Sequence, residues 1–114
     1  MVNKWEIYYC DLDPVRGSEQ KGTRPVLIIS ANAVNHNLTV STVLPLSSVK
    51  GSEKIYPTEI LLSTEISGLP KLSAAMVQQI RTISHNRLIN KVGSISDQET
   101  QEKISDGLLN YFDL

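Results

Sequence analysis

The chain has 114 residues, a net charge of -1, 40% hydrophobic residues and 20% charged residues. This composition is that of one globular domain with a modest core, and it excludes a disordered or fibrous chain. The single cysteine, Cys10, excludes a disulfide framework and fits a reducing compartment. The amino terminus turns polar before a signal-like apolar stretch forms, and no apolar run approaches the roughly 20 residues that cross a bilayer. We therefore expect one soluble, cytoplasmic domain over residues 1–114.

The weak net charge also bears on nucleic-acid binding. Non-specific binders owe most of their affinity to a basic excess that neutralises phosphates, and this chain has none. Any RNA site must therefore be local, or be shared between subunits.

Short segments rich in β-forming residues, separated by turn residues, account for most of the chain. Strands are predicted at residues 5–10, 25–30, 39–47, 55–63, 74–83 and 91–95. Between the first two, residues 11–22 hold Pro14, Gly17 and Gly22 among polar residues, which predicts an exposed, mobile loop. Residues 31–37 predict one helical turn.

The strand at residues 39–47 alternates between two faces. Val40, Leu44 and Leu46 are expected on the core side, and Ser47 on the opposite side. Pro45 cannot donate a hydrogen bond to a neighbouring strand, so it predicts an edge or a bulge near the end of this strand.

After residue 95 the pattern changes to a helical period. Ser96-Asp-Gln-Glu99 has the pattern of a capping box, and Ile104, Leu108, Leu109 and Phe112 follow at helical spacing. We expect an amphipathic terminal helix that packs on the domain, although such a helix also serves as a partner-binding element. Many short strands followed by one helix predict a mainly β fold, a small barrel closed by the terminal helix.

Three sequence blocks carry a resemblance to a known family. The first is D-L-D-P-V-R-G-S-E-Q-K-G-T-R-P, residues 11–25, followed by a hydrophobic strand. The second is V-L-P-L-S-S at residues 43–48, and the third is Q-I-R-T-I at residues 79–83. In this order, and with the terminal helix, they resemble the MazF/PemK (Kid/EndoA-type) toxins of type II toxin-antitoxin systems along the whole chain.

The resemblance implies an SH3-like barrel of the CcdB/MazF kind that forms a homodimer with an RNA groove across it. It implies a sequence-specific endoribonuclease that cleaves single-stranded mRNA without a metal or other cofactor, and a MazE/PemI-like antitoxin whose disordered tail folds into the groove. The family's catalytic pair carries over to Arg24 and Ser47. The predicted RNA-binding residues are Ser18, Glu19, Gln20, Ser48 and Gln79.

General chemistry supports this pair. Without a metal, the RNA 2′-hydroxyl must attack the adjacent phosphate, and the protein must stabilise the developing charge and protonate the departing 5′-oxygen. The planar guanidinium of Arg24 can bind two phosphate oxygens, Pro25 favours an extended backbone at Arg24, and Ser47 adds a neutral donor. The general base stays open, because arginine is already protonated near neutral pH and cannot accept a further proton. Glu19 is the nearest carboxylate candidate in the sequence.

Several polar residues have structural alternatives. Gln79 could instead satisfy buried backbone groups, and His36, His85 and Cys10 are expected to be structural. Some family members have a histidine where this chain has Ser18, or an acidic residue where it has Gln78. No cluster with metal-ligand spacing is visible.

Two other functions remain open. A CcdB-like toxin of the same fold binds gyrase without catalysis, and a plain SH3-like module binds a partner without chemistry. The Arg24–Ser47 pair favours the ribonuclease, because a gyrase poison has no use for it.

Overall fold

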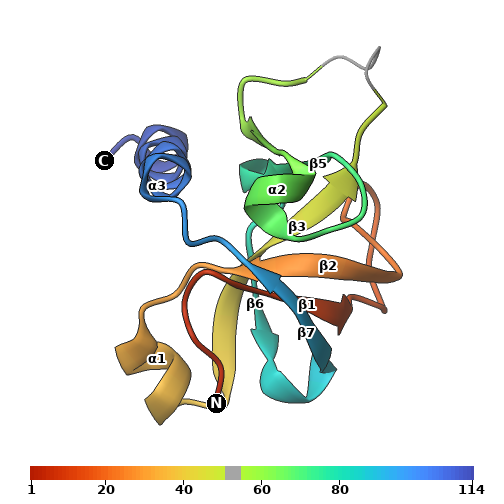
Figure 1. Cartoon of the computed structure of the whole chain (residues 1–114). Helices are drawn as coiled ribbons and strands as arrows, with labels where there is room; N and C mark the ends of the chain where they lie inside the picture. Colours follow the sequence, from red (N-terminus) through yellow and green to blue (C-terminus); the bar gives the residue numbers. More distant parts are fainter. Residues whose placement is uncertain (51–54) are drawn as a thin grey trace.

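The computed structural model describes residues 1–50 and 55–114 (Figure 1). In these residues one curved antiparallel sheet forms the centre, three α-helices lie around it, and two single 3-10 turns connect its strands. The elements are β1 (Glu6–Asp11), β2 (Thr23–Ile28), α1 (Asn32–Asn37), β3 (Val40–Ser48), β4 (Glu59–Leu62), α2 (Thr64–Ser67), β5 (Ser73–Met76), η1 (Val77–Gln79), β6 (Arg81–Ser84), η2 (His85–Arg87), β7 (Leu88–Ser94) and α3 (Gln98–Phe112). The mainly β fold with a terminal helix is confirmed.

The long strand β3 organises the sheet, whose strand order is β4-β5-β3-β2-β1-β7. On one side β3 pairs with β2. On the other side its first half pairs with β6 and its second half with β5. In the described part of the chain the pairing path ends at β4 and β7, so the barrel is not closed by hydrogen bonds.

The prediction of one strand at residues 74–83 is wrong, because the 3-10 turn Val77–Gln79 divides it into β5 and β6. The prediction that Pro45 marks an edge is also wrong, because Pro45 is buried in the central strand and lies opposite Val26 of β2. Pro45 lies where β3 changes partner from β6 to β5. Its missing N–H therefore falls where the ladder is already interrupted.

Two clusters of buried apolar residues form the core. Leu44 and Leu46 belong to the first, together with Ile104 of α3, whereas Val43 belongs to the second. The expected division of β3 into one core face and one polar face is therefore wrong in its middle, where both faces are buried. The second cluster also contains Cys10, which is fully buried as expected, and burial raises the pKa of its thiol.

The terminal helix α3 begins one residue later than the capping-box pattern predicts. Asp97, not Ser96, is the N-cap, and its carboxylate accepts from the Thr100 backbone N–H at 3.0 Å. Ile104 is buried as predicted, but Leu109 and Phe112 are 48% and 50% exposed. The far end of the helix therefore keeps an apolar surface that the described residues leave exposed. Among the described residues, no helix is long and apolar enough to span a membrane.

Candidate active site

The loop between β1 and β2 is held at its base and at its tip by the third sequence block, and at its base also by Arg87 of η2. At the base, Arg81 Nη1 donates to the Leu12 carbonyl at 3.0 Å, and Arg87 donates to the backbone of Asp11 and Asp13. At the tip, Gln79 Oε1 accepts from the Gln20 N–H at 3.1 Å, and its Nε2 donates to the Ser18 carbonyl at 3.0 Å. Gly17 and Gly22 have φ angles of 56° and 79°, which favour glycine. The loop is exposed, as predicted.

Both ends of the Gln79 amide are thus hydrogen-bonded to the loop backbone. Replacing Gln79 with alanine should leave the fold intact and speed hydrogen exchange at residues 18–20, because two hydrogen bonds of roughly 1 kcal/mol each are lost. Any activity of the protein that needs an ordered loop should fall about 10-fold. Hydrogen-exchange mass spectrometry on Gln79→Ala checks this, with the exposed Gln98→Ala as a control. Unchanged exchange at the loop tip would contradict the positioning role.

A first hollow of about 400 Å³ lies beside the base of this loop, a volume within the range of ligand-binding pockets. Three cations line it: Lys21 and Arg24 after the loop, and Lys71 before β5. The remaining lining residues are Tyr9, Thr23, Pro25, Leu46, Ser48, Leu69, Pro70 and Ser73. In the described part of the chain none of the three cations forms an ion pair. The hollow therefore combines uncompensated positive charge with an apolar wall.

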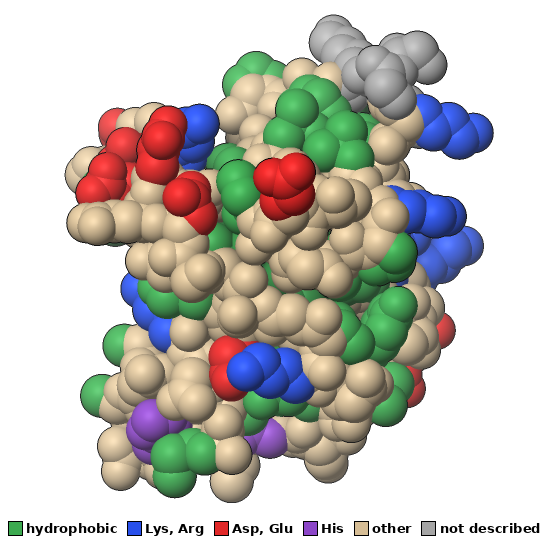
Figure 2. All heavy atoms as spheres, viewed as in Figure 1, with side chains coloured by type: hydrophobic (Ala, Val, Ile, Leu, Met, Phe, Trp, Pro, Cys, Tyr) green, Lys and Arg blue, Asp and Glu red, His purple; other side chains and the backbone are tan. Residues whose placement is uncertain are grey.

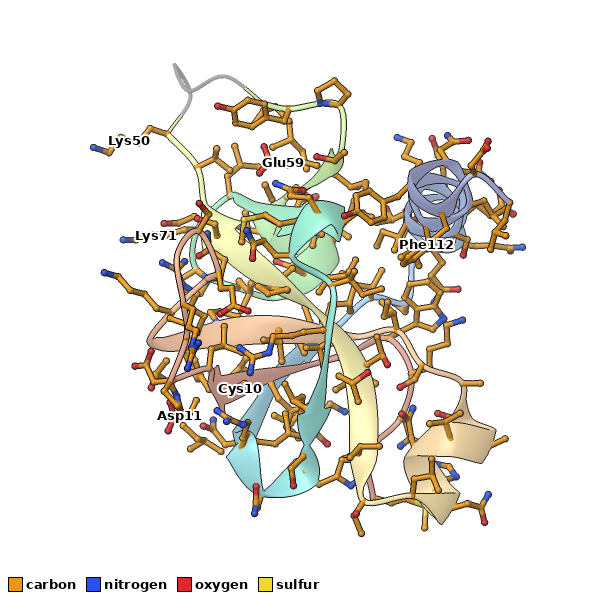
Figure 3. All side chains as sticks on the ribbon, turned by 180° about the vertical axis from the view of Figure 1, so that it is seen from behind. Cys10, Asp11, Lys50, Glu59, Lys71 and Phe112 are labelled. Atoms are coloured by element: carbon orange, nitrogen blue, oxygen red, sulfur yellow. The ribbon has the colours of Figure 1, made fainter. Side chains whose placement is uncertain are left out.

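The surface charge is divided in spite of the small net charge. Acidic side chains gather on α3, while lysine and arginine side chains project from the opposite edge (Figure 2). Lys50 and Lys71 lie on that basic edge (Figure 3). A basic edge of this kind is suited to a local polyanion site.

Arg24 is half-buried at the start of β2. Its Nε donates to the Lys21 carbonyl at 2.9 Å, which leaves the two terminal nitrogens without a partner among the described residues. Continuing the register in which Val26 faces Pro45 brings Arg24 opposite Ser47. The two predicted residues therefore lie on adjacent strands.

A second, smaller hollow of about 230 Å³ contains Ser47. Its other described lining residues are Gln20, Ser48, Val49, Tyr56, Glu59, Ala74 and Met76. Arg24 lines the first hollow and Ser47 the second, and Ser48 lines both. The structure thus brings Ser47, Ser48 and Gln20 together, with Arg24 on the neighbouring strand.

The remaining predicted residues lie on the exposed loop. Ser18 contacts Gln79 through its carbonyl only. The Glu19 carboxylate accepts from the Arg16 backbone N–H and lines neither hollow. Sequence reasoning missed Lys71 and Glu59, which reach the hollows from segments outside the three blocks. No local pattern marks either residue.

A buried serine and histidine resemble a catalytic dyad but cannot act as one. Ser41 is fully buried, and its Oγ lies 2.7 Å from both His85 Nε2 and Asn35 Oδ1. The Asn35 amide nitrogen donates to the Ser30 carbonyl, which fixes Oδ1 as an acceptor. The Ser41 proton is therefore committed to Asn35, and His85 must donate to Ser41 rather than activate it.

The second histidine, His36, contacts Asn3 Oδ1 through Nε2 at 2.8 Å and lines neither hollow. Both histidines thus have structural contacts, as expected. Over residues 1–50 and 55–114, no group of three or more His, Cys, Asp or Glu side chains is arranged to hold a metal ion.

The fold is shared with toxins of known structure. A mycobacterial endoribonuclease, solved in complex with its cognate antitoxin, superimposes with a TM-score of 0.80 at 22% identity, covering 100% of this chain and 97% of that one. The small antiparallel sheet with a terminal helix is therefore the fold of that endoribonuclease.

Sequence comparison gives the family. The family of PemK-like, MazF-like toxins of type II toxin-antitoxin systems matches residues 3–111. Endoribonuclease MazF9 of Mycobacterium tuberculosis is 35% identical over 100% of this chain and 98% of its own length. Endoribonuclease EndoA of Bacillus subtilis is 31% identical over 95% and 91%. The chain belongs to the PemK-like, MazF-like toxin family, and the gyrase-binding alternative is not supported.

Proposed function

We propose that this protein is the endoribonuclease toxin of a type II toxin-antitoxin system, acting in the cytoplasm on single-stranded RNA. The relatives of similar length are named endoribonucleases, which supports the reaction class. The observation that carries the proposal is Arg24, whose terminal nitrogens have no protein partner in the described chain and which lies beside a cation-lined hollow, on the strand next to that of Ser47. An unpaired guanidinium at such a place is suited to bind a phosphodiester.

The proposed reaction needs no metal. The RNA 2′-hydroxyl attacks the adjacent phosphorus, and Arg24 and Ser47 donate hydrogen bonds to the phosphate oxygens as negative charge develops there. Arg24 also supplies the proton that the departing 5′-oxygen needs. Ser48 and Gln20 line the path of the RNA, Gln79 and Arg81 hold the loop, and Ser18 and Glu19 stay predicted contacts of the loop with RNA.

We also propose a homodimer inhibited by a MazE/PemI-like antitoxin. The family is one of toxin-antitoxin pairs. A groove between subunits would bring two basic edges together and so concentrate the cations that a single chain lacks.

The experiment that tests the activity is incubation of the purified protein with a long transcript in a metal chelator. Discrete fragments with reproducible ends are expected. Intact RNA under these conditions, together with binding of gyrase, would favour the CcdB-like alternative. Mapping the fragment ends also gives the recognition sequence.

Lys71 should contribute binding rather than chemistry. Lys71→Ala is expected to raise KM several-fold with kcat nearly unchanged, and to flatten the log–log salt dependence of RNA binding by about 0.7, the value for one phosphate contact on a single strand. Lys103→Ala is the matched control, because Lys103 is exposed on α3 and pairs with Glu99. Binding measured by fluorescence anisotropy at several salt concentrations checks this. Equal slopes for the two variants would remove Lys71 from the RNA site.

A further inference from the structure

A 2′-hydroxyl that attacks a phosphate must lose its proton, and neither Arg24 nor Ser47 can accept it near neutral pH. The group must be a base within reach of the attacked phosphate. Among the described residues, Glu59 of β4 is the one carboxylate that lines either hollow, and it lines the hollow that contains Ser47. Resting on the proposed function, we infer that Glu59 is the general base of the reaction.

The pairing of three strands brings Glu59 to this place. Ser47 of β3 lies opposite Ala74 of β5, and Ala74 lies opposite Leu61 of β4, two residues after Glu59. Alternate residues on a strand share a face, so Ser47 and Glu59 look out from the same side of the sheet. Neighbouring strands are about 4.8 Å apart and a strand advances about 3.3 Å per residue, so the Cα atoms of Ser47 and Glu59 lie about 12 Å apart, two strands across and two residues along. The residue of β5 between them is the small Ala74, which leaves room above the sheet for a ribose and its phosphate.

The carboxylate of Glu59 is held in place without being neutralised. Its Oε1 accepts from the Tyr56 N–H at 3.0 Å and its Oε2 from Gln78 Nε2 at 3.3 Å. No lysine or arginine of the described chain forms an ion pair with it. Each oxygen keeps a lone pair for a further donor. Glu59 lies in the upper part of the molecule in Figure 3, between the edge that bears Lys50 and the helix that bears Phe112.

The side chain of Gln20 offers a second acceptor for a ribose hydroxyl at the same hollow. Gln20 lines the hollow, and its buried Oε1 has no hydrogen-bond partner among the described residues. A buried acceptor left unpaired costs roughly 1–3 kcal/mol, which a hydroxyl donor of the ligand would recover. The cations of the first hollow suit phosphate, whereas the acceptors of the second suit the ribose hydroxyls. This division favours RNA over an acidic peptide at Glu59, because a peptide carboxylate would be repelled there.

In the proposed cleavage step, each bond change is matched by a proton transfer to Glu59 or from Arg24. The 2′-hydroxyl proton passes to the Glu59 carboxylate as the O2′–P bond forms. The P–O5′ bond breaks with its electron pair on O5′, which takes a proton from the Arg24 guanidinium. Exchange with water then removes the proton from Glu59 and restores that of Arg24. The products are a 2′,3′-cyclic phosphate and a 5′-hydroxyl.

The test compares Glu59→Gln with Glu19→Gln in the full-length protein on a defined RNA. Glutamine keeps an acceptor for the Tyr56 N–H, and rotation of the Gln78 amide can satisfy its new NH₂ group, so the fold should be preserved. Loss of the base should lower kcat about 100-fold with little change in KM, and the rise of rate with pH at the acid end should disappear. Glu19→Gln removes a predicted loop contact with RNA, so it should raise KM but keep that rise of rate with pH.

Glu59→Asp provides the second variant. It keeps a carboxylate, so its rate should be reduced but should still rise with pH at the acid end. Glu59→Gln with a full rate and an unchanged pH profile, or loss of the acid-end rise in Glu19→Gln instead, would overturn the inference. A wild-type protein that cleaves no RNA would fail the proposed function itself, which is a distinguishable result.

Discussion

Replacing Arg24 with alanine is expected to reduce RNA cleavage by on the order of 100-fold or more, because loss of one donor to a developing charge costs about that much. Ser47→Ala should lose activity by the same reasoning. Neither change should unfold the protein, since Arg24 is half-buried with one backbone contact and Ser47 is half-buried at the end of β3. Single-turnover cleavage of a defined RNA measures the effect.

Arg24→Lys is the informative companion. It keeps the charge but loses the planar fork that binds two phosphate oxygens, so it should recover RNA binding and only part of the rate. Circular dichroism and size-exclusion profiles of all variants should match those of wild type. Arg24→Ala cleaving at a near-normal rate would refute the catalytic assignment.

Adding an antitoxin segment that is acidic and disordered should abolish cleavage in competition with RNA. Lys21, Arg24 and Lys71 form no ion pair in the described chain, so an acidic peptide could occupy the phosphate positions of the first hollow. Inhibition should weaken with salt, because exposed charges are screened over about 10 Å at 0.1 M. Titration with the neighbouring gene product at several salt concentrations checks both statements.

Light scattering on the toxin alone tests the dimer and should give twice the chain mass. In the antitoxin titration, Lys71→Ala should weaken the binding of both antitoxin and RNA. A strictly monomeric toxin that cuts RNA at low concentration would contradict the proposal of an RNA groove shared between two subunits. An antitoxin that binds without displacing RNA would leave the dimer standing but refute this route of inhibition.

The sequence predicted those elements whose pattern is local. The aromatic-rich β1, the apolar β2, the short α1 and the helix built around Ile104 all follow from periodicity and turn residues. The division of residues 74–83 did not, because the turn at Val77–Gln79 exists only where β3 exchanges β6 for β5. That exchange is a tertiary event, which a pattern read along one segment does not contain.

The site divides in the same way. Arg24, Ser47 and the loop residues could be predicted as site residues because they lie inside blocks of fixed order. The contacts of Gln79 with the loop could not be read from the sequence. Glu59 and Lys71 lie in segments without a motif, and they enter the hollows through the pairing of β4 and β5 and through the turn before β5. Glu19, the nearest carboxylate in sequence, lines neither hollow in space.

The central claim is that the RNA provides its own nucleophile. It is tested most directly with a short RNA carrying a single 2′-deoxy nucleotide on the 5′ side of the mapped cleavage bond, incubated with the protein in a metal chelator. We predict that this RNA binds normally and stays intact, while the unmodified RNA is cut to a 2′,3′-cyclic phosphate and a 5′-hydroxyl. Cleavage of the deoxy-substituted bond at a comparable rate would contradict the mechanism.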